Sequence, residues 1–257
     1  MFSTRHGGVS APPFDSLNLG GGVGDDPAAV QVNRDRLAAA AGLPRDRIGW
    51  MRQVHGTTVT GVGTPAGRPS PPDPGPAPRP AEQADGIVTT DTDLALAVLV
   101  ADCVPILAGD PVAGVVAAVH AGRRGAAGGI GLRALRRMIA AGAAVENVEV
   151  WLGPAICGAC YEVPAGMRDE VDDALPGSAC RTDQGTPGLD LRAGLARQFR
   201  EAGVATLLVD PRCTYGDPQL FSHRRGAPTG RLAGLIWMPG RPSRCVATRS
   251  PPRRTIT

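Results

Sequence analysis

The sequence predicts a protein of the α/β or α+β class, folded as a single domain around a mixed β-sheet. Its 257 residues are enough to bury a sizeable core. Two short and continuously apolar runs, residues 94–101 and 112–119, are typical of strands that are buried on both faces of a sheet. Strand-like and helix-like segments alternate irregularly along the chain, which favours a mixed sheet over a regular strand–helix–strand series.

The first regular element is a helix expected at residues 26–41. Asp26 and Pro27 are the residue types preferred at the N-cap and the first helical position, and Gly42 marks the end of the helix.

A strand is expected next, at residues 48–54, where IGWMRQV leads into His55. The segment 63–82 that follows is dense in proline. We expect it to be a loop or flexible insertion without a core of its own.

The two apolar runs each end at a side chain that binds metals well. The run 94–101 continues directly into Asp102 and Cys103, and the run 112–119 continues into His120. Ligands and catalytic groups gather in the loops at strand ends, so both places are candidates for a functional site.

Five glycines fall within the eleven residues after His120, and LRALRRMIAAG then has helical periodicity up to Gly142. A strand, a glycine-rich turn and a helix are therefore expected in succession. Further strands are predicted at 147–152, 204–209 and 232–237, and further helices near 165–175 and 190–202. No internal repeat is present. We expect one domain over residues 1–238 and a flexible, basic and proline-rich tail over 239–257.

The composition excludes some function classes. All 27 basic residues are arginine, so no lysine can form a Schiff base or act as a general base. The net charge of +3 is mild and the arginines are scattered, so nucleic-acid binding is not expected. Aromatic residues make up only 4%, so small and branched side chains must fill the core.

The location follows from what the chain lacks. No window approaches the roughly 18 apolar residues of a membrane span, and the N-terminus MFSTRHGGVS has no signal-peptide pattern. We therefore expect a cytoplasmic protein without a membrane partner. Its six cysteines would then be reduced thiols, metal ligands or nucleophiles.

Histidine is scarce, with only His6, His55, His120 and His223 in the chain. Four imidazoles cannot supply a trinuclear copper cluster together with a blue-copper site. A single-metal site needs only three ligands.

His55, Cys103 and His120 each follow a predicted strand. Two imidazoles and one thiolate suit Zn²⁺ and leave a fourth position for water or substrate. The alternative is that each residue stands alone, the histidines in hydrogen-bonded loops and the cysteine in the core.

The glycine-rich segment after His120 could place backbone N–H groups near an anion, with Arg123 and Arg124 adding positive charge. A phosphate or a carboxylate would fit there. A merely tight strand–helix turn with two exposed arginines is the alternative.

The cysteines outside this group give a weaker signal. CGAC at 157–160 could be redox-active or half of a zinc site, but no second pair follows at zinc-ribbon spacing. Cys180, Cys213 and Cys245 are isolated in the sequence. We expect all of these to be structural thiols.

Taken together, the motifs resemble those of the YfiH/laccase-domain family, whose members are also called multicopper polyphenol oxidase-like proteins or peptidoglycan editing factors. The resemblance covers roughly residues 3–238. It rests on STRHGGVS, LNLG, VGDDPAAVQVNRDRL, QVHG, ADGIVT, ADCVPIL, AVHAGRRG, LGPAICGACYEV, DPRCTY and FSHRRGAPTGRLAGLIWM, in that order.

The resemblance implies a single-domain layered α/β/β/α sandwich with mixed sheets, similar to the cysteine-hydrolase-like fold. It implies that His55, Cys103 and His120 are both the metal ligands and the catalytic centre, with zinc as the expected ion and copper as the alternative. From motif position alone, Arg5, Gln53, Asp102 and Arg124 are candidate substrate contacts, and Asp102 is also a candidate proton carrier.

The family's activities imply a purine nucleoside phosphorylase that acts on a nucleoside and phosphate, with adenosine deaminase and laccase-like activity as further expectations. The alternatives are a cysteine- or metal-dependent amidase that edits peptidoglycan precursors, a copper polyphenol oxidase, and an interaction protein that uses its tail and proline-rich loop. A monomer is expected. Two positions depart from the family pattern: Arg123 stands where a tryptophan is usual, and His223 where a tyrosine is usual.

Overall fold

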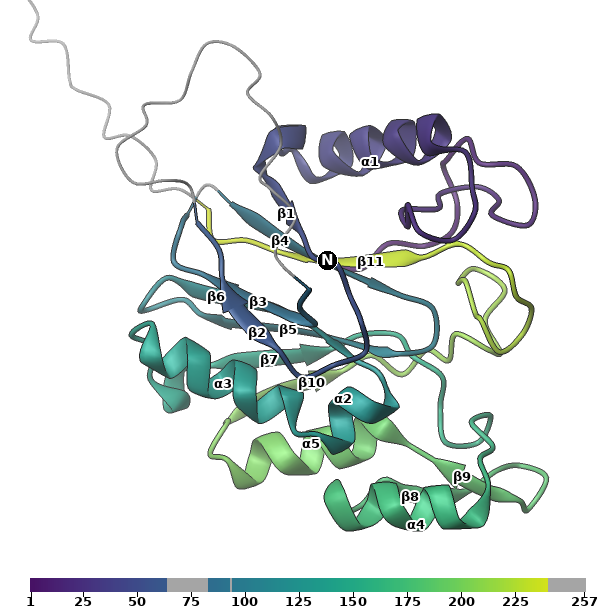
Figure 1. Cartoon of the computed structure of the whole chain (residues 1–257). Helices are drawn as coiled ribbons and strands as arrows, with labels where there is room; N and C mark the ends of the chain where they lie inside the picture. The colour runs from purple at the N-terminus through teal and green to yellow at the C-terminus, as the bar shows by residue number, and fades with distance from the viewer. Residues whose placement is uncertain (64–82, 93, 240–257) are drawn as a thin grey trace, which may run out of the picture.

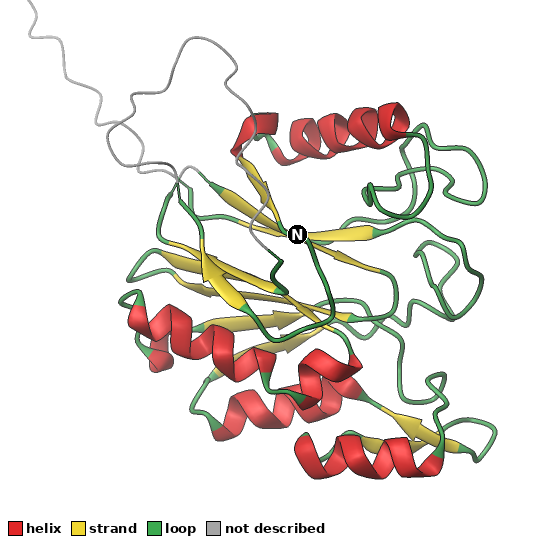
Figure 2. Cartoon of the chain, in the orientation of Figure 1, coloured by secondary structure: helices red, strands yellow, loops and turns green. Residues whose placement is uncertain are grey.

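Two β-sheets lie face to face in the middle of the molecule, with helices on both outer sides (Figures 1 and 2). The computed structural model describes residues 1–63, 83–92 and 94–239. The order of layers is helix, sheet, sheet, helix, which confirms the expected α/β/β/α arrangement in a single domain.

The smaller sheet has three strands, in the order β1 (Ile48–Trp50), β4 (Ala95–Val100) and β11 (Leu232–Ile236). Strand β4 is central, parallel to β1 and antiparallel to β11. Helix α1 (Pro27–Ala41) covers the outer face of this sheet (Figure 1).

The larger sheet has six strands. The parallel pairs are β10–β7 and β2–β3, and the others are antiparallel, so the sheet is mixed as predicted. The order is β10 (Thr206–Val209), β7 (Glu149–Leu152), β5 (Val104–Asp110), β6 (Val115–Ala121), β3 (Gly86–Thr89) and β2 (Val59–Gly61).

Four helices lie on the far side of the larger sheet (Figure 1). Beside α4 lies a separate two-stranded hairpin, and two short 3₁₀ helices precede β1 and β7. The four helices are α2 (Arg123–Ala127), α3 (Ile130–Ala140), α4 (Ala165–Ala174) and α5 (Leu191–Glu201); the hairpin is β8 (Ala179–Arg181) with β9 (Pro187–Leu189); the 3₁₀ helices are Arg45–Arg47 and Val145–Asn147.

Three buried clusters fill the spaces between the four layers. Successive residues of β5 point to opposite faces, so neighbours in the sequence belong to different clusters. Aliphatic side chains dominate all three, as the low aromatic content predicts. Examples are Leu37 with Leu235 under α1, Leu96 with Leu107 between the sheets, and Ile106 with Phe199 under α5.

The helix predicted at 26–41 is present as α1. The side chain of Asp26 accepts a hydrogen bond from the backbone N–H of Ala28, and Pro27 opens the helix. Gly42 ends it in the left-handed conformation, at φ 67°.

Several strand boundaries differ from the prediction. Strand β1 ends at Trp50 rather than at residue 54, so the segment before His55 is a loop. Residues 104–110 form β5, which was not predicted, and the run predicted at 112–119 is β6, shifted to 115–121. The reason is a tight turn at 111–114, where Gly114 has φ 71° and lets two apolar stretches pair as a hairpin.

Strands β2, β3, β8 and β9 were also not predicted. They are three or four residues long and too short for a periodic signal. The proline-rich loop predicted at 63–82 and the tail predicted at 239–257 lie outside the described residues, apart from Gly63 and Pro239. Across the part that is described, no helix combines the length and apolar character needed to cross a membrane.

Candidate metal centre and cavity

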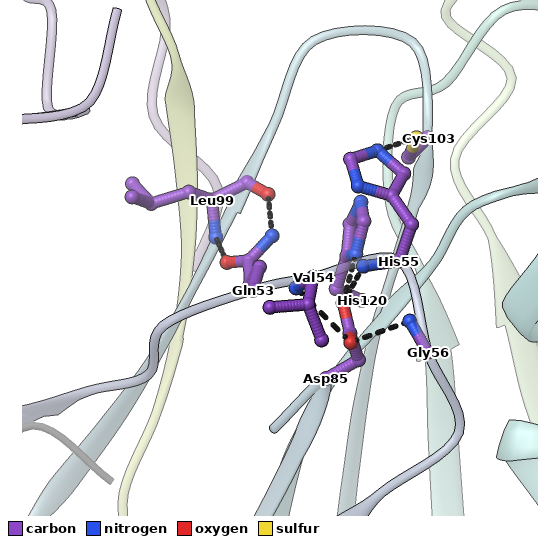
Figure 3. A network of polar contacts seen from close by, with 8 residues as sticks. All are labelled: Gln53, Val54, His55, Gly56, Asp85, Leu99, Cys103 and His120. Carbon is purple, nitrogen blue, oxygen red and sulfur yellow. Dashed lines mark hydrogen bonds and ion pairs between the residues drawn. The ribbon is translucent and has the colours of Figure 1, made fainter. Parts of the chain in front are cut away.

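Three side chains from distant parts of the chain converge at one end of the larger sheet (Figure 3). His55 lies in the loop between β1 and β2, Cys103 in the connection between β4 and β5, and His120 within β6. Their potential ligand atoms all lie within 4.8 Å of one another. The Cys103 Sγ is 4.0 Å from the His55 Nε2, and the two imidazole rings meet edge to face at 4.7 Å between centroids.

The pairing of β5 with β6 brings two of the three together. Val104 is opposite Ala121 and Pro105 is opposite His120, so Cys103 emerges beside the end of β6. His120 therefore lies inside a strand, not just after one as expected.

The backbone at this point is constrained. His55 and Asp102 both have positive φ, at 61° and 89°, which is unusual for residues other than glycine. A Cβ on Gly122 would lie 3.1 Å from the Cys103 Sγ and 3.0 Å from the His55 ring. A side chain at position 122 would therefore press on two of the three converging residues.

Asp85 organises the site and was missed in the sequence. It lies just before β3, is fully buried, and accepts the His120 Nδ1–H at 2.8 Å (Figure 3). Its two oxygens also accept the backbone N–H groups of Val54, His55 and Gly56, at 3.2, 2.9 and 2.7 Å. One carboxylate thus fixes both the His120 ring and the loop that carries His55.

The hydrogen bond to Asp85 occupies the Nδ1 of His120 and leaves the Nε2 to bind a metal. Because Nδ1 is engaged by Asp85, Nε2 is the ring nitrogen that faces Cys103 and His55. A carboxylate behind a histidine ligand is the usual way in which proteins orient the imidazole and raise its basicity. The only sequence signal for Asp85 is an acidic residue directly before the apolar GIV of β3.

Neighbouring groups shift the pKa values of the three titratable side chains at this site. Burial opposes ionisation of Cys103, yet hydrogen bonds from His120 and His55 lower the pKa of its thiol to about 6. Burial likewise opposes the charged form of His120, but Asp85 and Cys103 raise its pKa to about 9. The pKa of Asp85 is lowered in spite of burial by its bond to His120. These shifts favour a thiolate at Cys103, whereas a bound metal would have to displace the proton that they favour on His120.

The donor set fits Zn²⁺. A thiolate and two imidazoles are zinc ligands, and bonds of about 2.0–2.3 Å in a tetrahedron place the donor atoms roughly 3.3–3.6 Å apart. The ligand atoms of the three side chains are up to 4.8 Å apart, so a small inward movement of these side chains would bring them to that distance.

A cavity of about 850 Å³ opens over the three residues. Its lining carries positive charge, with Asp102 as the single acidic residue among the described lining residues. Tyr161 contributes an aromatic ring. The arginines of the lining are Arg34, Arg52, Arg123, Arg124, Arg224 and Arg231. The cavity can therefore bind an anion next to the candidate metal ligands.

The four residues predicted as substrate contacts do not all line the cavity. Arg124 lines the cavity. Gln53 also lines it, but its amide is held by the backbone of Leu99 through two hydrogen bonds of 2.7 and 2.8 Å (Figure 3). Arg5 is not among the described lining residues; it binds Asp15 and stacks on a phenylalanine ring.

Asp102 borders the cavity, but both of its carboxylate oxygens are engaged. One accepts the Thr214 hydroxyl at 2.6 Å and the other accepts the backbone N–H of Arg224 at 2.7 Å. These bonds fix the connection that carries Cys103. The two residues that depart from the family pattern, Arg123 and His223, both line the cavity.

The other cysteines differ from expectation in one respect. Cys213, predicted to be isolated, lies beside Cys157 and Cys160, with the three sulfur atoms within 4.8 Å of one another. The Cys180 thiol donates to the carbonyl of Gly158 at 3.5 Å, and Cys245 lies outside the described residues.

Comparisons with known proteins agree with this architecture. The family model for multi-copper polyphenol oxidoreductase laccase matches residues 1–239. A Mycobacterium tuberculosis protein named purine nucleoside phosphorylase is 57% identical over 236 residues, covering 92% of this chain and 90% of that protein. The crystal structure of YlmD from Geobacillus stearothermophilus is 36% identical, with a TM-score of 0.82 over 93% of this chain and 91% of the other. The YfiH protein of Bacillus licheniformis is 30% identical, with a TM-score of 0.81 over 92% and 91%. The chain therefore belongs to the laccase-like YfiH family of multi-copper polyphenol oxidoreductase proteins.

Proposed function

We propose that the protein is a zinc-dependent purine nucleoside phosphorylase. The observation that carries this proposal is the joining of a His–Cys–His donor set to an arginine-lined cavity in a chain 57% identical to a protein of that name. Phosphorolysis needs a site for phosphate beside a site for the nucleoside. The cavity has the charge for the first and the volume for both.

His55, Cys103 and His120 would hold the ion, with Asp85 fixing the orientation of His120. When bound, zinc would act as a Lewis acid on a substrate oxygen. Copper is the alternative ion that the family name suggests.

The reaction transfers the ribosyl group from the base to phosphate. A phosphate oxygen forms a bond to C1′, the C1′–N9 bond breaks, and the purine leaves with the electron pair and takes up a proton. Arg124 and Arg123, which line the cavity at the start of α2, would bind the phosphate and hold its attacking oxygen. The base would lie in the part of the cavity lined by Tyr161, whose ring carries the Arg224 guanidinium 5.1 Å from its centroid.

Adenosine deamination is the second reaction that we propose for the same site. It needs water instead of phosphate, attacking C6 of adenine and releasing ammonia. A zinc ion held by His55, Cys103 and His120 would supply the activation of that water.

A metal-independent amidase is the rival, and one observation favours it. The lowered pKa of Cys103 and the neighbouring His120 are also what a nucleophilic thiol and its base require. The two proposals differ in the reactivity of the thiol. A nucleophilic Cys103 should react with iodoacetamide in the protein as purified, whereas a zinc-bound thiolate should react only after a chelator is added.

The test is an adenosine assay read by chromatography, with zinc-loaded and chelated protein and with or without phosphate. Phosphorolysis gives adenine only when phosphate is present, and deamination gives inosine without it. We expect Cys103→Ala to lose activity, while the control Cys180→Ala, at a cysteine not among the residues that line the cavity, keeps it. Turnover by Cys103→Ala or by chelated protein would contradict the metal-dependent mechanism.

A further inference from the structure

Three cysteines that do not line the cavity form a second cluster of potential metal ligands. Cys157 and Cys160 lie on a turn that follows β7, and Cys213 comes from the segment after β10. Their sulfur atoms all lie within 4.8 Å of one another. All three are partly exposed, so an ion has a route to the site from solvent.

The backbone holds these two segments in register without any sulfur bond. Ala155 and Cys213 form a parallel β-bridge, and the N–H of Thr214 donates to the carbonyl of Ala155 at 3.1 Å. Within the turn, the N–H of Cys160 donates to the carbonyl of Cys157 at 3.0 Å. The convergence of the thiols is therefore built into the fold.

The surroundings of Cys213 favour a thiolate. Its Sγ accepts the N–H of Cys157 at 3.4 Å. Backbone N–H groups directed at a sulfur stabilise its negative charge, as metal-bound thiolates require.

The other two thiols complete the cluster by their positions. Cys157 and Cys160 lie on the same turn, and both sulfur atoms are within 4.8 Å of the Cys213 sulfur. A disulfide would use two of the sulfurs and leave the third unexplained.

We propose that Cys157, Cys160 and Cys213 bind a second zinc ion, separate from the ion proposed at His55, Cys103 and His120. A Cys-x-x-Cys pair on a tight turn, joined by a cysteine from a distant segment, is a zinc-ligand spacing. Three thiolates complete all but one position of a tetrahedron. This inference does not rest on the proposed function.

The second site is connected to the first through the backbone. Ile156, next to Cys157, donates its N–H to the carbonyl of Asp102 at 3.0 Å, and Thr214, next to Cys213, donates its hydroxyl to the Asp102 carboxylate. Zinc at the three cysteines would therefore fix the residue that precedes Cys103.

Metal content of the full chain after loading with Zn²⁺ under a reductant tests the proposal, and Cys103→Ala isolates the new site. We expect two zinc ions per chain in the wild type and one in Cys103→Ala. Adding Cys160→Ser and Cys213→Ser to Cys103→Ala should reduce the content to zero. Failure of the proposed function alone would give one ion in both wild type and Cys103→Ala. A zinc-free Cys103→Ala protein would overturn the second site.

Alkylation of the wild-type protein gives a readout that does not depend on folding of the variants. We expect iodoacetamide to leave Cys157, Cys160 and Cys213 unmodified in zinc-loaded protein and to modify them after chelation. In Cys103→Ala loaded with cobalt instead of zinc, the thiolate-to-cobalt charge-transfer absorption should have the intensity expected for three thiolate ligands. Equal alkylation with and without zinc, or a disulfide among the three, would overturn the proposal.

Discussion

Replacing Asp85 with asparagine tests the claim that one carboxylate builds the metal centre. The change keeps the shape of the side chain but exchanges one acceptor oxygen for an NH₂ group. In the wild type, Oδ1 accepts the His120 Nδ1–H and the His55 N–H, and Oδ2 accepts the N–H groups of Val54 and Gly56. Whichever way the amide is turned, two N–H groups then face a donor.

The magnitude follows from these contacts. Asp85 is fully buried, so each of the two donors left without an acceptor costs about 1–3 kcal/mol, or about 2–6 kcal/mol of unfolding free energy in total. The loss of the negative charge behind His120 should also weaken zinc binding by about 10–100-fold.

Urea unfolding of the metal-free protein and zinc titration against a competing chelator measure the two effects. Asp110→Asn is the matched control, because Asp110 is also fully buried and accepts three backbone N–H groups, but lies at the opposite end of β5 from Cys103. The control should lose stability and keep its zinc affinity. Unchanged zinc affinity in Asp85→Asn would refute the role given to this carboxylate.

Three further predictions concern the cavity and the fold. Arg124→Ala should raise the KM for phosphate by about 10–100-fold with little change in the KM for adenosine. The control Arg133→Ala, on the exposed side of α3, should change neither KM. Equal effects of the two substitutions would contradict the anion site. Asn33 is buried and makes four hydrogen bonds to the N-terminal segment. Asn33→Ala should therefore lower the free energy of unfolding in urea by about 2–4 kcal/mol without altering zinc binding. A loss below about 1 kcal/mol would contradict this interpretation. Burial opposes ionisation of Asp110, but backbone N–H donors outweigh it and lower its pKa, so its stabilisation is present above about pH 4 and is lost as the pH falls through the lowered folded-state value. The stability gap between wild type and Asp110→Ala should therefore narrow below about pH 4, and a constant gap down to pH 2 would contradict the assignment.

The strongest local signals predicted their elements correctly. Helix α1 has a capping aspartate, a proline and a terminal glycine in the right order, and the run that became β4 is uniformly apolar because both of its faces are buried. Strand β5 could not be separated from its neighbours by periodicity, since it follows β4 after a connection of only three residues.

The three candidate metal ligands could be predicted from the sequence, but the residues that hold them in position could not. His55, Cys103 and His120 stand out by residue type, and their convergence was an expectation that the geometry matches. Asp85 and the pairing of Cys213 with Cys157 and Cys160 depend on contacts between residues far apart in the chain, which spacing alone does not encode. Arg5 was a candidate from motif position alone; its side chain binds Asp15, and its part in substrate binding stays a prediction.

Phosphorus NMR of the zinc-loaded protein with adenosine and inorganic phosphate tests the central claim most directly, with adenine quantified in the same sample. The proposed phosphorolysis predicts that inorganic phosphate disappears in step with the formation of one sugar phosphate and one adenine, and that Cys103→Ala shows no change. Adenosine that stays intact, or that becomes inosine while phosphate is untouched, would contradict it.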